Sequence, residues 1–300
     1  MVAKLIDGQA VSEKILNSVR QKMKETGIVP HLVAVQVGED PASMFYVKNQ
    51  KKQAEAIGIR YTLNQLDIKT TQEKLLSEIE RLNKDDDVTG IILQMPLPEH
   101  IDRRVAQQAI DYRKDVEGIT PTSLGLLLQD RPQMVPCTAL GAVELLHSVV
   151  DKVEGLDCTI VGRSEIVGKP IAMLLLSMSR SATVTVCHSR SKDLAAKVAS
   201  ADILFAAVGK PSIIKGKWIK NGAIVIDVGI NRIPLKDKDG KPILDDKGKQ
   251  KYTTVGDVEF EVAKERAAYI TPVPGGVGPM TTAILMRNTL EAALRLKNIR

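Results

Sequence analysis

Short runs of branched apolar residues alternate with amphipathic segments along most of the chain. In the first half, the pattern predicts strands over 31–38, 59–66 and 90–98 and helices over 41–57 and 71–82. Gly58 is placed to end the first of these helices. The next segment, 111–123, is polar and rich in turn residues, so we expect a surface loop there. Such alternation of strand and helix is typical of an α/β protein.

The second half repeats this alternation in a more regular order. A helix is predicted over 139–150, and the segment 156–178 follows as strand, tight loop and helix. Further strands are predicted over 182–189, 202–209 and 223–230. A helix is predicted near 192–200 and a long helix over 279–297. The β-α-β-α-β order predicts a Rossmann-type, doubly wound parallel sheet. One polar stretch, 236–251, holds six Lys and four Asp and is expected to form a solvated hairpin or loop insertion.

Composition narrows the class of protein. The 300 residues are 44% apolar and 26% charged, which fits a globular chain of two domains. A surplus of six positive charges favours small anionic ligands, while only nine aromatic residues argue against a nucleic-acid platform. The apolar runs are too short to cross a bilayer, and the N-terminus has no apolar core of an export signal. Three cysteines without a CxxC pair fit a reducing cytoplasm and no structural metal.

A candidate phosphate-binding loop, VGRSEIVGKP (161–170), lies where a strand gives way to a helix. Gly162 would permit a tight turn, and Gly168 would leave backbone amides at the helix N-terminus free for an anion. Arg163 and Ser164 lie between them. The alternative is a strand–helix turn that needs glycine only for steric reasons.

The residues at the end of the next strand, CHSRSKD (187–193), indicate whether the sheet binds NAD or NADP. NAD-binding folds usually place an acidic residue here to bind the ribose hydroxyls. This chain has His188, Ser189 and Arg190 instead, with Arg163 in the loop, which would suit the 2′-phosphate of NADP. The alternative is that Arg190 and Lys192 belong to a solvated basic face.

Several motifs together carry a resemblance to a known family. They are IDG at 6–8, SMFYV at 43–47, GIILQMPLP at 90–98, KDVEG at 114–118, VGRSEIVGKP at 161–170, GAIVIDVGIN at 222–231 and YITPVPGGVGPMT at 269–281. Over nearly its full length the chain resembles the methylenetetrahydrofolate dehydrogenase/methenyltetrahydrofolate cyclohydrolase family of one-carbon metabolism. The resemblance implies a folate-binding domain over 1–138, completed by the C-terminal helix 279–300, and an NADP-binding domain over 139–278. It also implies an active site in the cleft between them and a homodimer formed through the NADP domains.

The resemblance also implies site residues. Tyr46 matches the family's tyrosine that stacks on the folate, and Gln94 matches its glutamine. The family's catalytic lysine, four residues after the tyrosine, is replaced by Gln50, and its aspartate by Glu117. Further substrate contacts are expected from Pro272, Gly275, Gly276 and Val277, and a further cofactor contact from Ile230.

These two departures affect the two activities differently. Hydride transfer from methylenetetrahydrofolate to NADP needs orientation and exclusion of water but no protein acid or base. Hydrolysis of methenyltetrahydrofolate needs a group that moves protons, and an amide has no usable proton at neutral pH. We therefore expect a dehydrogenase with weak or lost cyclohydrolase activity. Two alternatives stay open. One is a bifunctional enzyme in which Lys48, Lys51, Lys52 or an ordered water replaces the base, and the other is a non-catalytic folate or dinucleotide binder.

The other candidate groups carry less weight. Glu117 keeps a carboxylate one methylene longer than the family's, which would weaken folate binding unless a pliable loop adjusts. Asp227 ends a predicted strand at the edge where such folds bind ligands, with a turn or cap role as the alternative. His31, His100 and His147 lack metal-ligand spacing, so no metal site is expected.

Overall fold

The structure is a computed structural model that describes residues 2–237 and 240–299. The chain divides into two compact units, one formed by residues 1–11 and 138–280 and the other by residues 12–137 and 281–300. The first eleven residues therefore belong with the sheet of the second half, not with the first domain as the sequence suggested. The reason is β1 (Lys4–Leu5), whose two residues pair in parallel with Tyr269 and Ile270.

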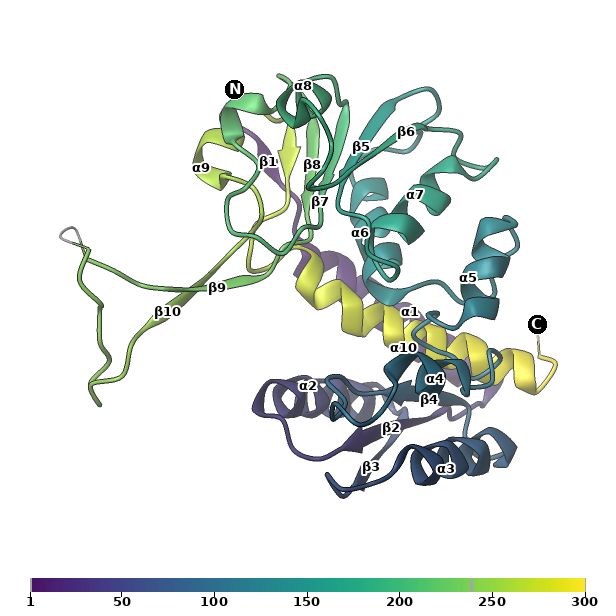
Figure 1. Ribbon diagram of the computed structural model, residues 1–300. Coiled ribbons are helices and arrows are strands. Elements are labelled where there is room, and N and C mark those ends of the chain that lie inside the picture. Colours follow the sequence, from purple (N-terminus) through teal and green to yellow (C-terminus); the bar gives the residue numbers. More distant parts are fainter. Residues whose placement is uncertain (1, 238–239, 300) are drawn as a thin grey trace. The chain divides into compact units, whose positions relative to one another are not determined.

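The unit of 1–11 and 138–280 is built on a six-stranded sheet whose adjacent strands are all parallel (Figure 1). In sheet order the strands are β1, β11 (Tyr269–Ile270), β8 (Ile224–Asp227), β7 (Ile203–Ala206), β5 (Asp157–Val161) and β6 (Thr183–Cys187). The chain runs from β5 outward to β6 and then returns to β7 on the other side of β5. This reversal makes a topological switch point at the carboxyl ends of β5 and β7. The predicted Rossmann-type doubly wound sheet is confirmed.

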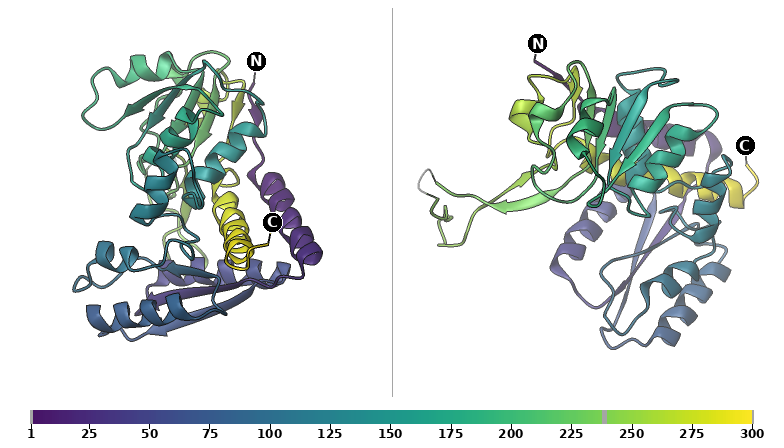
Figure 2. Two further views of the ribbon diagram at one scale, coloured as in Figure 1. Left: turned by 90° about the vertical axis from the view of Figure 1, so that its right-hand side faces the viewer. Right: turned by 45° about the horizontal axis from the view of Figure 1, so that its top comes forward.

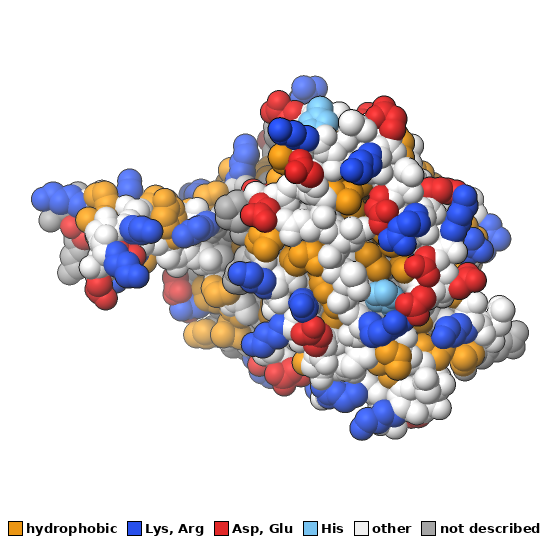
Figure 3. Space-filling model, turned by 90° about the horizontal axis from the view of Figure 1, so that it is seen from below, with side chains coloured by type: hydrophobic (Ala, Val, Ile, Leu, Met, Phe, Trp, Pro, Cys, Tyr) orange, Lys and Arg blue, Asp and Glu red, His pale blue; other side chains and the backbone are white. Residues whose placement is uncertain are grey.

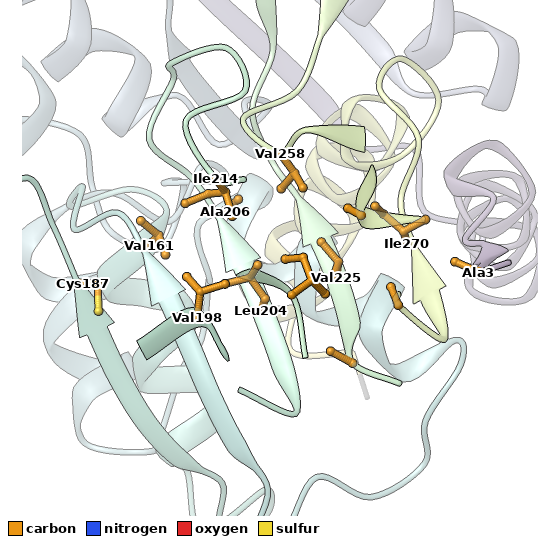
Figure 4. Close-up of a cluster of buried hydrophobic side chains, with 14 residues drawn as sticks. Ala3, Val161, Cys187, Val198, Leu204, Ala206, Ile214, Val225, Val258 and Ile270 are labelled. Atoms are coloured by element: carbon orange, nitrogen blue, oxygen red, sulfur yellow. The ribbon is translucent and has the colours of Figure 1, made fainter. Parts of the chain in front are cut away.

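Buried aliphatic side chains join these strands to the helices around them. In Figure 4, Val161, Leu204, Val225 and Ile270 lie in a row across adjacent strands. The helices of this unit are α6 (Cys137–His147), α7 (Gly168–Leu176), α8 (Leu194–Ala199), the 3-10 turn η1 (Gly216–Trp218) and α9 (Phe260–Ala263). Val198 of α8 packs into the same apolar cluster, so strands and helix share one core.

A two-stranded arm extends from this sheet (Figures 1 and 2). It consists of β9 (Asn231–Pro234) and β10 (Tyr252–Val255), which pair antiparallel, and of the segment between them. Isolated antiparallel bridges, Lys236 with Pro242 and Leu244 with Gln250, continue the pairing, so the hairpin predicted at 236–251 is confirmed for the part described. Residues 238 and 239 of that prediction lie outside the described residues. Lys and Arg side chains gather on the arm in Figure 3.

The unit of 12–137 and 281–300 contains a three-stranded parallel sheet in the order β3 (Arg60–Leu66), β2 (His31–Val37), β4 (Gly90–Leu93). Its helices are α2 (Pro41–Ile57), α3 (Gln72–Lys84), α4 (Arg103–Gln108) and α5 (Pro121–Leu128), while α1 (Gly8–Thr26) and α10 (Val277–Leu296) each cross the division between the units. The central strand β2 is buried along nearly all of its length. Its alternate residues Val33, Val35 and Val37 pack with apolar side chains of α3.

In the first half, one predicted strand was too long and one helix was not predicted. The strand expected over 90–98 ends at Leu93, ahead of the cis peptide bond Met95–Pro96. The helix α1 was not predicted, although it spans 19 residues. At its first residue, the Gly8 N–H donates a hydrogen bond to the Gly275 carbonyl at 3.0 Å.

Candidate active site

The loop between β5 and α7 depends on two close backbone approaches. Gly162 has φ +135°, and a Cβ added to it would lie 2.2 Å from the Ala207 carbonyl oxygen. A Cβ on Gly168 would lie 2.2 Å from the carbonyl oxygen of Gly162. The steric need for glycine is therefore real, and it brings the start of α7 onto the carboxyl end of β5.

The start of α7 bears on the predicted anion site. Within the described chain, no side chain caps the first turn of α7, which begins after Val167. The Ser164 hydroxyl accepts a hydrogen bond from Val167 N–H at 3.1 Å, and the side chains of Arg163 and Ser164 are exposed. In this turn the Lys169 N–H already donates to the Ser164 carbonyl at 3.1 Å and residue 170 is a proline without an N–H, so the steric need for glycine is shown and phosphate binding stays a prediction.

The turn after β6 carries the residues expected to choose the dinucleotide. The His188 N–H donates to the Ser191 hydroxyl at 2.9 Å, and the ring nitrogen Nδ1 accepts from Arg190 N–H at 3.1 Å. Ser189 and Arg190 are exposed on this turn. The strand ends at Cys187 and His188 follows it, so the position where an NAD site has a carboxylate is neutral or basic here. Ser191, which fixes the turn, was missed by sequence reasoning.

A pocket of about 170 Å³ gathers the Pro/Gly segment after β11 and the residues after β8. Its lining includes Pro272, Gly275, Gly276, Val277 and Ile230, all of which were predicted as ligand contacts. Gly275 has φ +108°, and a Cβ on Gly276 would come within 2.7 Å of the Pro272 carbonyl oxygen. Glycine is therefore required here by the backbone conformation at 275 and by close packing at 276, and ligand contact stays a prediction.

Asp227 lies at the base of the same pocket, but its carboxylate ties loops together. It accepts hydrogen bonds from the backbone N–H groups of Gly229 and Asp257 at 2.9 and 3.0 Å, and from Val258 N–H at 2.9 Å. Burial raises its pKa to about 6, against the opposing effect of these hydrogen bonds. The geometry thus favours the turn role for Asp227. Asp257, missed from the sequence, similarly accepts from the N–H groups of residues 208, 209 and 210.

In the unit of 12–137 and 281–300, α2 presents Tyr46 and Gln50. Asp40 caps this helix by accepting from Ser43 N–H at 2.8 Å, and Gly58 ends it with φ +91°, as predicted. The two residues are one turn apart and therefore on the same face. The Tyr46 side chain is 55% exposed.

Gln50 is held by two neighbours. Its side-chain oxygen Oε1 accepts from the Tyr61 hydroxyl at 3.1 Å and from Gln94 Nε2 at 2.9 Å. Gln94, just beyond β4, is buried and its backbone N–H donates to the Val35 carbonyl. Tyr61 was missed from the sequence because a tyrosine in a strand is ordinary.

The three lysines near Gln50 are exposed to solvent. Lys48, Lys51 and Lys52 are all exposed, and Lys51 pairs with Glu55 along the helix at 3.8 Å. The expectation that they form a solvated face is confirmed.

The KDVEG segment is not the surface loop that the sequence predicted. Lys114, Asp115 and Val116 are buried. The Asp115 carboxylate accepts from the N–H groups of Gly118 and Thr120 at 2.9 and 2.8 Å and from the Ser123 hydroxyl at 2.7 Å. The prediction failed because internal hydrogen bonds satisfy these charged residues, which a polarity pattern assigns to solvent. These hydrogen bonds argue against the pliable loop expected around Glu117.

Glu117 follows directly in this fixed segment. Its side chain is partly buried, and burial together with the nearby Asp115 charge raises its pKa to about 8. A carboxyl group with such a pKa is mostly protonated at neutral pH, so it can donate as well as accept hydrogen bonds.

A residue from the end of the chain also reaches this segment. Asn288 of α10 donates to the carbonyl oxygens of Val116 and Val135 at 2.9 and 3.2 Å. It is separated from them by more than 150 positions, so no local pattern points to it.

Two absences among the described residues bear on other classes of protein. No group of three or more His, Cys, Asp or Glu in that part of the chain could hold a metal ion. None of its helices is both long enough and apolar enough to pass through a bilayer.

Fold and sites together define a two-domain α/β protein with a dinucleotide-type sheet. Comparison with known families makes this specific. Residues 6–117 match the tetrahydrofolate dehydrogenase/cyclohydrolase catalytic domain, and residues 136–297 match the NAD(P)-binding domain of the same family. The chain belongs to the tetrahydrofolate dehydrogenase/cyclohydrolase family.

Individual relatives agree with this assignment. The bifunctional protein FolD of Moorella thermoacetica is 47% identical over 298 residues, which cover 98% of this chain and 100% of that protein. The crystal structure of the bifunctional FolD of Campylobacter jejuni is similar with a TM-score of 0.87 and 39% identity, over 98% of this chain and 99% of that one. The Trypanosoma brucei FolD structure, a complex with NADP cofactor and inhibitor, has a TM-score of 0.86 and 39% identity over 98% of both chains.

Proposed function

We propose that this protein oxidises 5,10-methylenetetrahydrofolate to 5,10-methenyltetrahydrofolate with NADP, and that its cyclohydrolase activity is weak or lost. The observation that carries this proposal is Gln50, an amide at the position of the family's lysine, whose oxygen is already engaged by Tyr61 and Gln94.

The dehydrogenase half requires binding and orientation. NADP accepts the hydride, and a folate nitrogen lone pair stabilises the cation that forms, so the protein need not move a proton. The exposed Tyr46 ring would stack on the folate, with Glu117 as a hydrogen-bonding partner. The α7 N-terminus and the exposed Arg163 and Arg190 suit the phosphates of NADP, including its 2′-phosphate.

Hydrolysis makes a further demand. A water must lose a proton as it attacks the methenyl carbon, and a folate nitrogen must gain one as the ring opens. Gln50 can do neither, and its oxygen is not free to orient the water. General acid–base catalysis contributes about two to four decades in rate, so hydrolysis should fall by that order.

Full bifunctionality is the second candidate, because the relatives that match over the whole chain are named bifunctional. Two assays on one preparation separate the candidates: NADP reduction with methylenetetrahydrofolate, and loss of methenyltetrahydrofolate absorbance above the buffer rate. Hydrolysis at a rate comparable to dehydrogenation would refute the first candidate in favour of the second.

The cofactor preference has its own test. Arg190→Ala should lower the preference for NADP over NAD about tenfold or more, since a charged hydrogen bond to the 2′-phosphate would be lost. Arg232→Ala, on the arm, is the matched control. An unchanged preference in Arg190→Ala would remove Arg190 from the 2′-phosphate site.

The proposal includes a homodimer formed through the NADP domains, as the family resemblance implies. Sedimentation equilibrium at micromolar concentration tests it, with a single species of monomer mass as the contrary result. The cytoplasmic location stays a prediction.

A further inference from the structure

Two hydrogen-bond donors converge on one atom of Gln50. The Tyr61 hydroxyl reaches Oε1 at 3.1 Å and Gln94 Nε2 reaches it at 2.9 Å. Tyr61 comes from β3, Gln94 from the end of β4, and Gln50 from α2. Three separate elements thus fix which end of this amide faces the sheet.

The other end of the amide is left for a ligand. In the described part of the chain, Tyr61 and Gln94 both bond to Oε1 and neither bonds to Nε2. The nitrogen and oxygen of a primary amide point about 120° apart, so engagement of the oxygen directs the N–H groups away from the two donors. Gln50 is only partly buried and shares a helix face with the exposed Tyr46.

We propose that Tyr61 is a positioning residue that, with Gln94, holds the Gln50 amide so that its N–H groups face the folate substrate. The acceptor would be a carbonyl oxygen or a ring nitrogen of the folate. This inference rests on the proposed function and deepens it: the fixed amide offers bound folate a donor and offers water no acceptor.

Tyr61 determines the orientation of the Gln50 amide because the reversed orientation would be less favourable. Gln94 is itself an amide and could turn to accept from a reversed Gln50. The Tyr61 hydroxyl could accept as well, but its own proton would then lose the acceptor that it has in the structure. Leaving a partly buried donor unpaired is unfavourable, so Tyr61 selects the orientation that Gln94 alone would not.

The test is a double-mutant cycle on folate kinetics in the NADP-reduction assay. Tyr61→Phe keeps the ring and removes only the hydroxyl, and Gln50→Ala removes the amide. We expect Tyr61→Phe to raise the KM for methylenetetrahydrofolate about 3- to 10-fold with kcat within about twofold of the parent. In the Gln50→Ala background the same substitution should change KM by less than about 1.5-fold. Tyr112→Phe gives the same chemical change in the loop before KDVEG and should leave both constants unchanged.

A second variant tests the inference even if Tyr61→Phe destabilises the protein. Gln50→Glu has the same size and can accept from both donors, but an ionised carboxylate has no N–H group. It should keep the thermal unfolding midpoint and raise KM at least as much as Tyr61→Phe. A wild-type KM in Gln50→Glu, or an equal effect of Tyr61→Phe in both backgrounds, would overturn the inference.

Failure of the inference is distinct from failure of the proposed function. If the parent protein does not reduce NADP with methylenetetrahydrofolate, the proposed function fails and the role of Tyr61 falls with it. If the parent is active and the cycle shows no coupling, only the role of Tyr61 is refuted.

Discussion

At the scale of single residues, the chemistry of Gln50 separates two activities that share one substrate site. A lysine at this helix position can be desolvated and tuned toward neutrality, whereas an amide cannot exchange protons at neutral pH. The neighbouring Gln94 would also accommodate an ammonium group, because its amide can turn so that the oxygen accepts from it.

Gln50→Lys should therefore raise the hydrolysis of methenyltetrahydrofolate about 10- to 1000-fold, since it supplies the missing proton-transfer group. Dehydrogenation should change by less than about threefold, because that step needs no base. Both rates are measured on the same preparation, from methenyl absorbance and from NADP reduction. Gln21→Lys, an equal charge change on the exposed face of α1, is the control. No gain in hydrolysis would place the defect at Glu117 or elsewhere in the site.

Glu117 gives a prediction for stability against pH. Its pKa is raised to about 8 by burial and by Asp115, so the folded protein holds this proton more tightly than the unfolded chain. The stability that it contributes is complete below the ordinary carboxyl pKa and is lost as pH rises through about 8. Asp227, with a pKa of about 6, makes its contribution at lower pH, which leaves the range from about 6 to 8 to Glu117.

Urea unfolding across that pH range should show the unfolding free energy falling with pH, by at most about 1.4 kcal/mol per pH unit for one proton. Glu117→Gln should flatten this slope, and Glu99→Gln at an exposed position should not. A slope that survives in Glu117→Gln would assign the titration to another group.

At the scale of elements, the loop between β5 and α7 is shaped by backbone contact. Gly162 combines φ +135° with a neighbouring carbonyl 2.2 Å from where a Cβ would be, so an alanine there must displace the loop.

Gly162→Ala should destabilise the protein by about 2 kcal/mol or more and raise the KM for NADP, because the displaced backbone would no longer present the start of α7. Gly125→Ala is the matched control, since Gly125 lies within α5 and a Cβ there meets nothing within 4 Å. It should be neutral or stabilising by up to about 1 kcal/mol. Calorimetric unfolding and NADP titration of both variants give the comparison, and equal behaviour would contradict the steric argument.

The helices, strands and loops differ in how well the sequence predicts them. The strands and helices around the glycine loop were predictable because apolar periodicity and turn residues are local, as at Gly58 and Gly168. The helix α1 was not predicted, although its buried residues Ile15, Val19 and Met23 recur at helical spacing. The burial of Asp115 could not be predicted, because its partners at 118, 120 and 123 become partners only once the loop closes.

At the scale of the whole molecule, each unit is assembled from distant stretches of chain. Residues 1–11 complete the sheet of the unit that also contains 138–280, and residues 281–300 complete the unit that contains 12–137. Candidate residues such as Gln94 were predictable from motifs, whereas contacts like those of Asn288 are set by this assembly and leave no local trace.

A substitution at Asn288 tests how much residues 281–300 contribute to the stability of their unit. Its amide satisfies two buried carbonyl groups, those of Val116 and Val135, and Val116 directly precedes Glu117. Asn288→Ala leaves both carbonyls without this donor, so the unfolding free energy should fall by about 2–4 kcal/mol. The KM for methylenetetrahydrofolate should rise as the KDVEG segment loosens, while the KM for NADP stays within about twofold.

The control for this change is Asn17→Ala on the exposed face of α1, which should alter stability by less than about 0.5 kcal/mol. Urea unfolding and the two Michaelis constants are measured for both variants. If Asn288→Ala lowered stability but left the folate constant unchanged, the hydrogen bonds of Asp115 would be sufficient to hold the KDVEG segment. If it raised both constants equally, the effect would be a general loosening and not a local support of the folate site.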